Sequence, residues 1–257
     1  FENRALHHHV FDMKLLKEVC HYLNVQVLLE NTTININLIS AAKEKKIKNF
    51  INLSSSCIYP NNFVEPIKES DLLTDKLEQT NEGYALAKII GLKMTDYISN
   101  DTDYNYKTII PCNLFGPNDN FDINFGHMIP SVINKIHLAK TNNDKMVTIW
   151  GDGNSRREFM YIKDLIDFIY YSIENIQKLP NFINVGVGSD HTIKEYYKMI
   201  SKVIGYKGNF KLDLSKPQGM KRKLIDISLL NNLGWKHKFQ VEEGLEETYK
   251  FYEQNYE

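Results

Sequence analysis

Helical patterns alternate with short apolar runs along most of this chain of 257 residues. The runs that predict strands are 48–53, 106–111, 146–150 and 182–186. The segments that predict helices are 31–46, 82–99, the stretch after Pro130 to about 140, 162–176, 192–204 and 241–255. Strands separated by helices are typical of βαβ units. The pattern therefore predicts an α/β protein built on a parallel sheet with helices on both faces.

Residues 1–82 contain no glycine, and the first glycine of the chain is Gly83. A dinucleotide-binding βαβ unit usually opens with a glycine-rich turn, because the backbone must approach a pyrophosphate closely. A Gly-x-Gly pattern at 151–153 follows a predicted strand but does not open a helix. We interpret it as a turn.

Composition excludes several classes of function. Lys and Arg number 31 and Asp and Glu 32, so no basic excess is available to bind nucleic acid. No apolar run approaches the roughly 20 residues of a membrane span, and no secretion signal is recognised. Cys20, Cys57 and Cys112 are too few for a disulfide framework, which favours the cytoplasm. The adjacent histidines 7–9 lack the spacing of helical metal ligands, so no metal site is expected.

Tyr84 and Lys88 are four residues apart in a predicted helix and so share one face. An ammonium beside a phenol would lower the pKa of the phenol, and such a tyrosine can exchange a proton with an alkoxide. The spacing alone more often marks an ordinary amphipathic helix. About thirty residues upstream, however, the segment 54–57 (SSSC) ends a predicted strand, where parallel sheets bind ligands. The joint pattern is much rarer than either part.

Seven segments then make the chain recognisable. They are SSSCIYP, TNEGYALAKIIGLKM, PCNLFGPNDNF, GHMIP, TIWGDGNSRREF, INVGVGSDHTIKE and LGW. In order and spacing they resemble the GDP-L-fucose synthases, a branch of the extended short-chain dehydrogenase/reductase family, from about residue 27 to the C-terminus. The resemblance implies a Rossmann-type NADP-binding domain over 1–120, without its N-terminal glycine-rich unit. A smaller GDP-sugar domain would follow over 121–257, with 162–186 returning to the first domain.

The activity that the resemblance implies is NADPH-dependent. It comprises 3,5-epimerisation and 4-reduction of GDP-4-keto-6-deoxy-D-mannose to GDP-L-fucose. NADP(H) would be the cofactor and a GDP-sugar the ligand, in a homodimer that uses the helix 82–99. Two alternatives stay open. One is an epimerase and reductase acting on another GDP-4-keto sugar, and the other is a truncated, catalytically silent protein that binds GDP-sugars.

The same resemblance implies roles for single residues. Tyr84 would protonate O4, with Lys88 as its partner on the nicotinamide ribose, and Ser55 would bind the C4 oxygen. Cys57 and His127 match the acid and base of epimerisation, and a thiol and an imidazole both titrate near working pH.

Further positions would bind ligands. The cofactor-binding set is Leu53, Ser54, Ser55, Ser56, Tyr84, Lys88, Pro111, Cys112, Asn113, Leu114 and His127. Lys135, Trp150, Arg157 and Gln218 would contact the GDP-sugar. The family has arginine at position 135 and aspartate at 218, so these two departures concern substrate detail. Cys112 is expected to be structural and unreactive, and Arg156 to be a solvated charge.

Residues 1–26 do not resemble the family. Three explanations compete. The chain is a piece of a longer enzyme, or it is a truncated relative that binds without turnover, or residues 1–26 rebuild part of the sheet.

Overall fold

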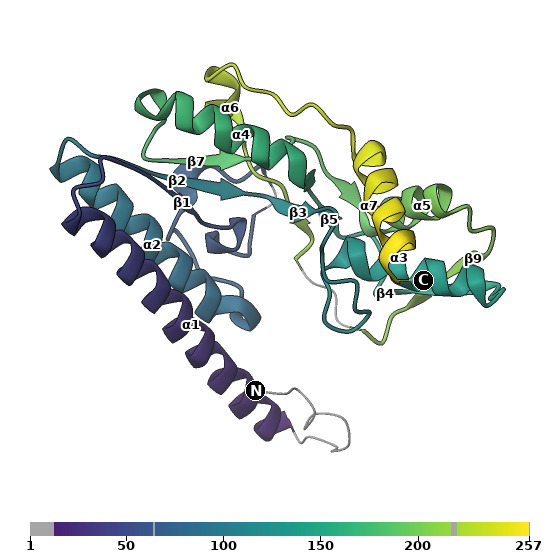
Figure 1. The fold of residues 1–257 in the computed structure, drawn as a ribbon. Coiled ribbons are helices and arrows are strands. Elements are labelled where there is room, and N and C mark those ends of the chain that lie inside the picture. The colour runs from purple at the N-terminus through teal and green to yellow at the C-terminus, as the bar shows by residue number, and fades with distance from the viewer. Residues whose placement is uncertain (1–12, 64, 217–219, 257) are drawn as a thin grey trace.

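The computed structural model describes residues 13–63, 65–216 and 220–256. Figure 1 shows the order of the elements. The longer helices are α1 (Met13–Glu44), α2 (Glu82–Asp101), α3 (Met128–Thr141), α4 (Ile162–Glu174), α5 (Ile193–Ile204) and α7 (Val241–Tyr256), and α6 is the short helix Ser228–Asn232. The strands are β1 (Asn49–Leu53), β2 (Asn105–Pro111), β3 (Asn113–Phe115), β4 (Met146–Trp150), β5 (Arg156–Arg157), β6 (Phe159–Tyr161), β7 (Phe182–Val185), β8 (His191–Thr192), β9 (Asn209–Asp213) and β10 (Arg222–Lys223).

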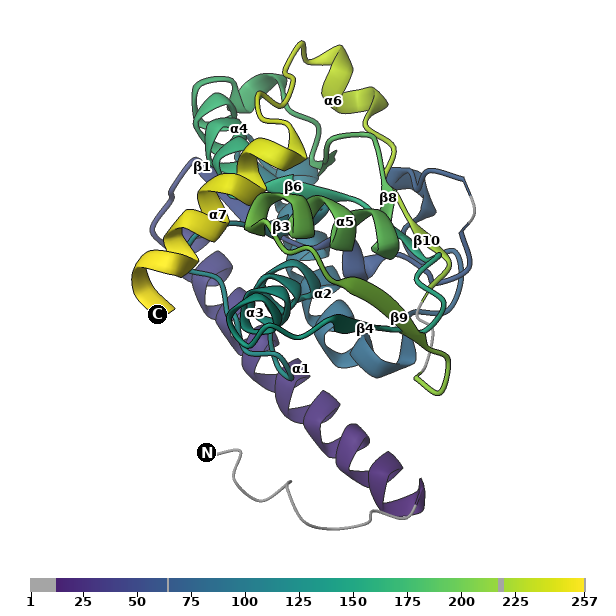
Figure 2. The ribbon, with the colours of Figure 1, turned by 90° about the vertical axis from the view of Figure 1, so that its right-hand side faces the viewer.

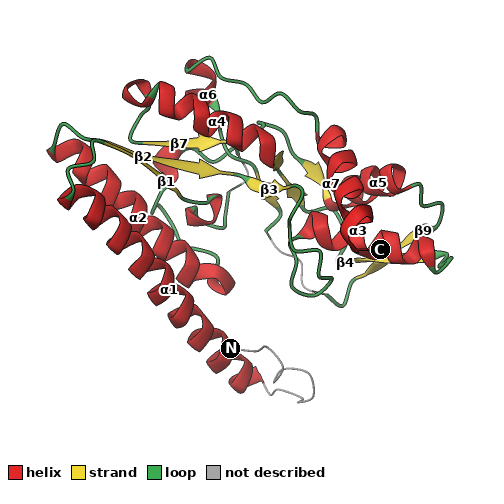
Figure 3. Cartoon of the chain, in the orientation of Figure 1, coloured by secondary structure: helices red, strands yellow, loops and turns green. Residues whose placement is uncertain are grey.

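A parallel sheet of three strands, in the order β1-β2-β7, organises one half of the molecule. Helices α1 and α2 cover one face of this sheet, and α4 and α6 lie over the other (Figures 1 and 3). The central strand β2 is buried from Tyr106 to Pro111, as expected for a strand covered on both faces. The α/β fold predicted from the alternating pattern is therefore confirmed.

Helix α1 is longer than predicted, since it begins at Met13 instead of residue 31. Its close packing on α2 depends on Gly91, where a Cβ atom would lie 2.9 Å from the side chain of Asn35. The buried Asn35 amide donates to the Ala87 carbonyl at 2.9 Å. Residues 13–26 thus form part of a helix. The explanation that the N-terminal segment rebuilds the sheet is wrong for them.

A second hydrophobic core lies among α3, α5 and α7, with the paired strands β4 and β9 beside it (Figure 2). Aromatic rings fill much of this core, and Phe159 packs against Phe115 and Tyr196 in T-shaped, edge-to-face pairs. Side chains of α4, by contrast, pack with the parallel sheet. The pair β3 and β6 continues from β2 toward the second core, so the two cores meet along this pair. The division into domains at residue 120 stays a prediction.

A small sheet of two-residue strands, β10-β5-β8, escaped the sequence pattern because such strands are too short to show a period. It corrects the expectation that Arg156 is solvated. The Arg156 Nε donates to Oδ1 of the buried Asp190 at 2.8 Å, and Arg222 Nε donates to Oδ2 at 2.6 Å. Within the described ranges, no helix is both long and apolar enough to cross a membrane.

Candidate active site

A cavity of about 1010 Å³ opens at the carboxyl ends of β1 and β2, between the sheet and the second core. Its lining combines both predicted catalytic segments with residues from α1, β5 and α5. The lining residues are Val27, Ser54, Ser55, Cys57, Asn81, Tyr84, Pro111, Cys112, Asn113, Leu114, Phe115, Gly116, Pro117, Asn118, Asp119, His127, Met128, Arg157, Phe159, Ile162 and Ile193. Many of the predicted site residues thus share one cavity, although they are far apart in sequence.

The serine segment turns sharply at the end of β1. The Ser54 amide still donates to the Ile109 carbonyl of β2, and the chain then enters a 3₁₀ turn over Ser56–Ile58. Ser55 caps this turn, because its hydroxyl accepts a hydrogen bond from the Cys57 amide at 3.3 Å. The Ser54 hydroxyl is buried at the cavity without a hydrogen-bond partner within the described residues. The turn therefore sets Ser54, Ser55 and Cys57 on the cavity wall.

Tyr84 lies in the first turn of α2, where its phenol hydrogen bonds the Ser55 hydroxyl. Burial raises the pKa of Tyr84, the Cys57 charge raises it further, and the Ser55 hydrogen bond only partly offsets them. Lys88 Nζ donates to the Leu53 carbonyl at 3.0 Å and lies 5.6 Å from the Tyr84 ring centre. The prediction that Lys88 lowers the pKa of Tyr84 is therefore wrong here. Burial also lowers the pKa of Lys88.

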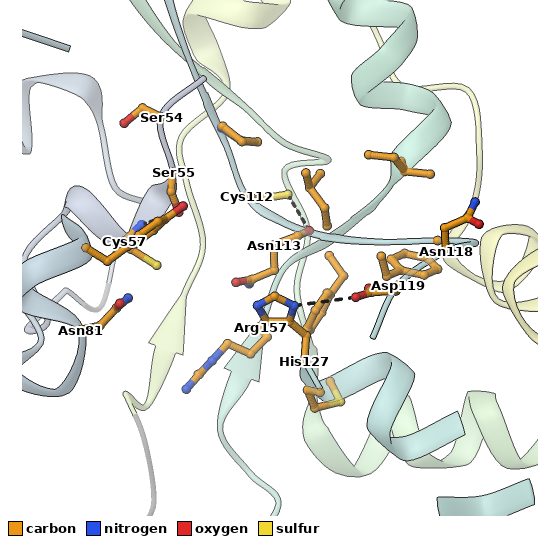
Figure 4. A pocket seen from close by; sticks show the side chains of 18 of the residues that line it. Ser54, Ser55, Cys57, Asn81, Cys112, Asn113, Asn118, Asp119, His127 and Arg157 are labelled. Atoms are coloured by element: carbon orange, nitrogen blue, oxygen red, sulfur yellow. Dashed lines mark hydrogen bonds and ion pairs between the residues drawn. The ribbon is translucent and has the colours of Figure 1, made fainter. Parts of the chain in front are cut away.

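Cys57 and His127 come from opposite walls of the cavity (Figure 4). Burial raises the pKa of Cys57, but the Lys223 charge and hydrogen bonds from Ser55, Lys223 and Asn81 together bring it below its ordinary value. The pKa of His127 is raised chiefly by the Asp119 carboxylate, which lies 3.9 Å from Nδ1. The two groups are thus biased toward thiolate and imidazolium.

The strand-end segment 111–114 lines the same cavity from the end of β2. Cys112 is buried, and its burial raises its thiol pKa well above the ordinary value, which agrees with an unreactive side chain. The Asn113 amide donates to the Glu158 carbonyl at 2.8 Å and so ties this wall to the segment between β5 and β6.

The predicted substrate residues do not all lie at the cavity. Arg157 lines the cavity, and its Nη1 donates to the carbonyls of residues 156 and 220. Lys135 and Trp150 lie outside the cavity lining. Lys135 Nζ donates to the Thr148 carbonyl at 2.6 Å and sits 5.5 Å from the Trp150 ring centre. Gln218 lies outside the described residues, as do histidines 7–9.

Three of the predicted cofactor residues do not line the cavity. They are Leu53, Ser56 and Lys88.

Three residues that face the Cys57 or His127 side chain were missed. Asn81 hydrogen bonds the Cys57 side chain, Asp119 faces His127, and Lys223 Nζ donates to Cys57 Sγ at 3.4 Å. Lys223 is 166 residues from Cys57 in sequence, so no local spacing could have paired them. Asp119 lies within the segment PCNLFGPNDNF and was the easiest of the three to find.

Comparison with known proteins settles the family. Residues 17–186 match the model of the NAD dependent epimerase/dehydratase family. The chain belongs to this family. Two of its relatives are a GDP-L-colitose synthase from Yersinia pseudotuberculosis and a GDP-L-fucose synthase from Azorhizobium caulinodans. They are 52% and 43% identical, over 89% of this chain and 74% and 73% of theirs.

Solved structures agree with this assignment. A GDP-mannoheptose C4 reductase from Campylobacter jejuni, solved with NADP bound, superposes with a TM-score of 0.81 at 30% identity. The superposition covers 90% of this chain and 77% of that one. The epimerase/dehydratase fold and the family resemblance predicted from the seven segments are therefore confirmed.

Proposed function

We propose that this chain catalyses the NADPH-dependent epimerisation and 4-reduction of GDP-4-keto-6-deoxy-D-mannose to GDP-L-fucose. The observation that carries the proposal is one cavity holding Ser55 and Tyr84 next to a thiol and an imidazole on opposite walls. The first pair suits proton donation to a ketone oxygen, and the second suits proton transfer at the neighbouring carbons. Relatives named GDP-L-fucose synthase support the same reaction.

The cavity suits the nicotinamide end of NADP(H). The Ser54 hydroxyl is buried there without a partner, and Pro111–Leu114 supply a half-apolar wall at the strand ends. Tyr84 and Lys88 would hold the nicotinamide ribose, beside Asn113 and His127. When bound, NADPH supplies the hydride for C4. The GDP-mannoheptose C4 reductase compared above was solved with NADP bound, which supports the same choice here.

Epimerisation uses the two oppositely biased groups. The Cys57 thiolate takes a proton from a ring carbon next to the ketone, and the C–H electron pair moves to the ketone oxygen. Hydrogen bonds from Ser55 and Tyr84 stabilise the charge that develops on that oxygen. The His127 imidazolium then protonates the carbon from the opposite wall, and the ketone forms again. His127 is 83% exposed at its side chain and can recover its proton from water.

Reduction uses the raised pKa of Tyr84. A phenol that stays protonated at neutral pH can deliver its proton to O4 as the alkoxide forms. Lys88 holds the Leu53 carbonyl at the end of β1 and keeps α2 in place beside the serine segment.

The nucleotide part of the substrate would lie toward Arg157 and Trp150. Arg157 offers a planar set of donors for phosphate oxygens. Trp150 is 54% exposed, and the ammonium groups of Lys135 and Lys216 lie 5.5 and 5.4 Å from its ring centre. We propose that these groups contact the GDP moiety.

A second substrate is favoured by one specific observation. The relative named GDP-L-colitose synthase is 52% identical, against 43% for the GDP-L-fucose synthase compared above. Another GDP-4-keto sugar therefore stays a candidate for the same site. Rates of NADPH oxidation on GDP-4-keto-6-deoxy-D-mannose and on its 3-deoxy analogue, compared in one assay, separate the two substrates.

The reaction is tested with Tyr84→Phe and Cys57→Ser. We expect Tyr84→Phe to slow NADPH oxidation by about 10²–10⁴-fold while solvent deuterium still enters the sugar ring. Cys57→Ser should slow that deuterium incorporation by a similar factor. If Tyr84→Phe oxidised NADPH at the wild-type rate, Tyr84 would be removed from the mechanism. If Cys57→Ser incorporated deuterium at the wild-type rate, Cys57 would be removed from it. If the wild-type chain binds GDP-sugar but oxidises no NADPH, the silent alternative is correct.

We further propose a homodimer in the cytoplasm, built on the exposed side of α1 and α2. Val25, Leu29 and Ile36 are exposed and fall on one stripe of α1. Light scattering should give about twice the chain mass, and Leu29→Glu should return it to the monomer mass. A monomeric wild-type protein would contradict the dimer.

A further inference from the structure

Lys223 is the charged group in direct contact with the Cys57 thiol. Its Nζ donates to Sγ at 3.4 Å, although Lys223 lies on β10 and Cys57 on the turn after β1. The other groups facing Cys57 are the hydroxyl of Ser55, the amide of Asn81 and the titratable side chains of Tyr84 and His127. Lys223 is therefore the cation that offsets a negative charge on sulfur.

The register of the small sheet explains how Lys223 reaches the thiol. Strands β5 and β10 pair in parallel, with Arg222 opposite Arg156 and Lys223 opposite Arg157. Because successive side chains of a strand point to opposite faces, Arg156 and Arg222 share one face and Arg157 and Lys223 the other.

On the first face, each of the two arginines forms an ion pair with one carboxylate oxygen of Asp190, whose exposed fraction is 7%. On the second face, Arg157 lines the cavity and Lys223 meets Cys57. One buried carboxylate thus aligns both strands, and their other face presents two cations to the site.

We propose that Lys223 is a positioning residue whose contact with Sγ favours the thiolate form of Cys57 that proton abstraction needs, and that the Arg156–Asp190–Arg222 cluster holds Lys223 there. The inference rests on the proposed function for its role in catalysis. The contact between Lys223 and Cys57 does not depend on it.

Burial and the charge of Lys223 act on the Cys57 thiol in opposite directions. Burial opposes the thiolate, and the Lys223 charge is the strongest influence acting the other way. Without Lys223, burial dominates and the thiol stays protonated at neutral pH. The proton that the thiolate accepts from substrate would then have no base to receive it.

The test is the rate at which iodoacetamide alkylates Cys57 as a function of pH, located by mass spectrometry on the intact chain. We expect Lys223→Met to raise the midpoint of the profile by about one pH unit and to lower the rate at pH 7 about tenfold. Lys223→Arg should keep most of the wild-type profile. Lys221→Met is the matched control, because it removes an exposed charge two residues away, and it should change nothing. An unchanged midpoint in Lys223→Met would overturn the proposal.

The cluster behind Lys223 is tested with Asp190→Asn, which leaves the two arginines without their shared carboxylate. The midpoint should rise by less than in Lys223→Met, with circular dichroism matching the wild type. A wild-type midpoint in this variant would remove the cluster from the proposal.

Deuterium incorporation into the sugar links the profile to catalysis. Lys223→Met should slow exchange at pH 7 by about the same factor as it slows alkylation, about tenfold, because both steps need the thiolate. Alkylation needs no substrate, so the two proposals fail separately. A shifted alkylation profile in a chain that exchanges no sugar proton refutes the proposed function alone. Wild-type exchange with an unshifted profile refutes the role of Lys223 alone.

Discussion

At the scale of single residues, the site biases two groups in opposite directions. The Asp119 carboxylate raises the pKa of His127 above its ordinary 6.5, which favours the proton donor at neutral pH. The pKa of Cys57 falls below its ordinary 9.0, which favours the acceptor. Exchange requires thiolate and imidazolium together, so its rate should fall on both the acid and the alkaline side.

Asp119→Asn tests this assignment. Losing the carboxylate lowers the pKa of His127, so less imidazolium remains at high pH. We expect deuterium exchange to fall roughly threefold to tenfold at pH 8.5 and to change little at pH 5.5. Equal losses at both pH values would mean that Asp119 supports the fold of the loop instead of the charge of His127.

At the scale of elements, α1 packs closely on α2, the helix that carries Tyr84. The helices approach closely because Gly91 leaves room for the buried Asn35. Gly91→Leu should therefore lower the free energy of unfolding by about 1–3 kcal/mol, as overpacking does in other cores. Tyr97→Leu is the control, since Tyr97 is 62% exposed on the same helix and should change stability by about 0.5 kcal/mol or less. Urea unfolding measures both, and equal effects would contradict this account of the interface.

At the scale of the whole molecule, Glu158 ties segments from both halves together. Its carboxylate accepts hydrogen bonds from the backbone amides of Val187 and Gly188, at 2.7 and 2.8 Å, and of Ile225 at 3.1 Å. Burial still raises the pKa of Glu158 to about 7, despite these bonds. Since this folded-state value exceeds the ordinary 4.5, its contribution to stability is full at low pH and is lost as pH rises through about 7.

The prediction compares wild type with Glu158→Gln, which does not titrate. Between pH 5 and pH 8 the wild type should lose roughly 2–3 kcal/mol of unfolding free energy relative to the variant. Urea unfolding at several pH values gives this difference. The pH dependence that all other titratable groups contribute is the same in both proteins and cancels. Parallel curves for the two proteins would show that Glu158 is ionised throughout.

The sequence by itself determined the class of fold, most elements and the family. Strands and helices have periods that can be read locally, and the helix predicted over 192–204 is α5, which Thr192 caps. Most of the predicted site residues also share the cavity, because motifs at strand ends converge in a parallel sheet. The prediction missed the two-residue strands, the strands β3, β6 and β9, and the first half of α1.

Only the tertiary structure decided the electrostatics of the site. Spacing on a helix suggested that Lys88 would lower the pKa of Tyr84. In the structure, Lys88 Nζ donates to the Leu53 carbonyl, and burial is the main influence on the pKa of Tyr84. The cation that acts on Cys57 is Lys223, from a strand distant in sequence. A pKa depends on burial and on charges within a few ångströms, and both are set by packing between distant segments instead of by neighbours in the chain.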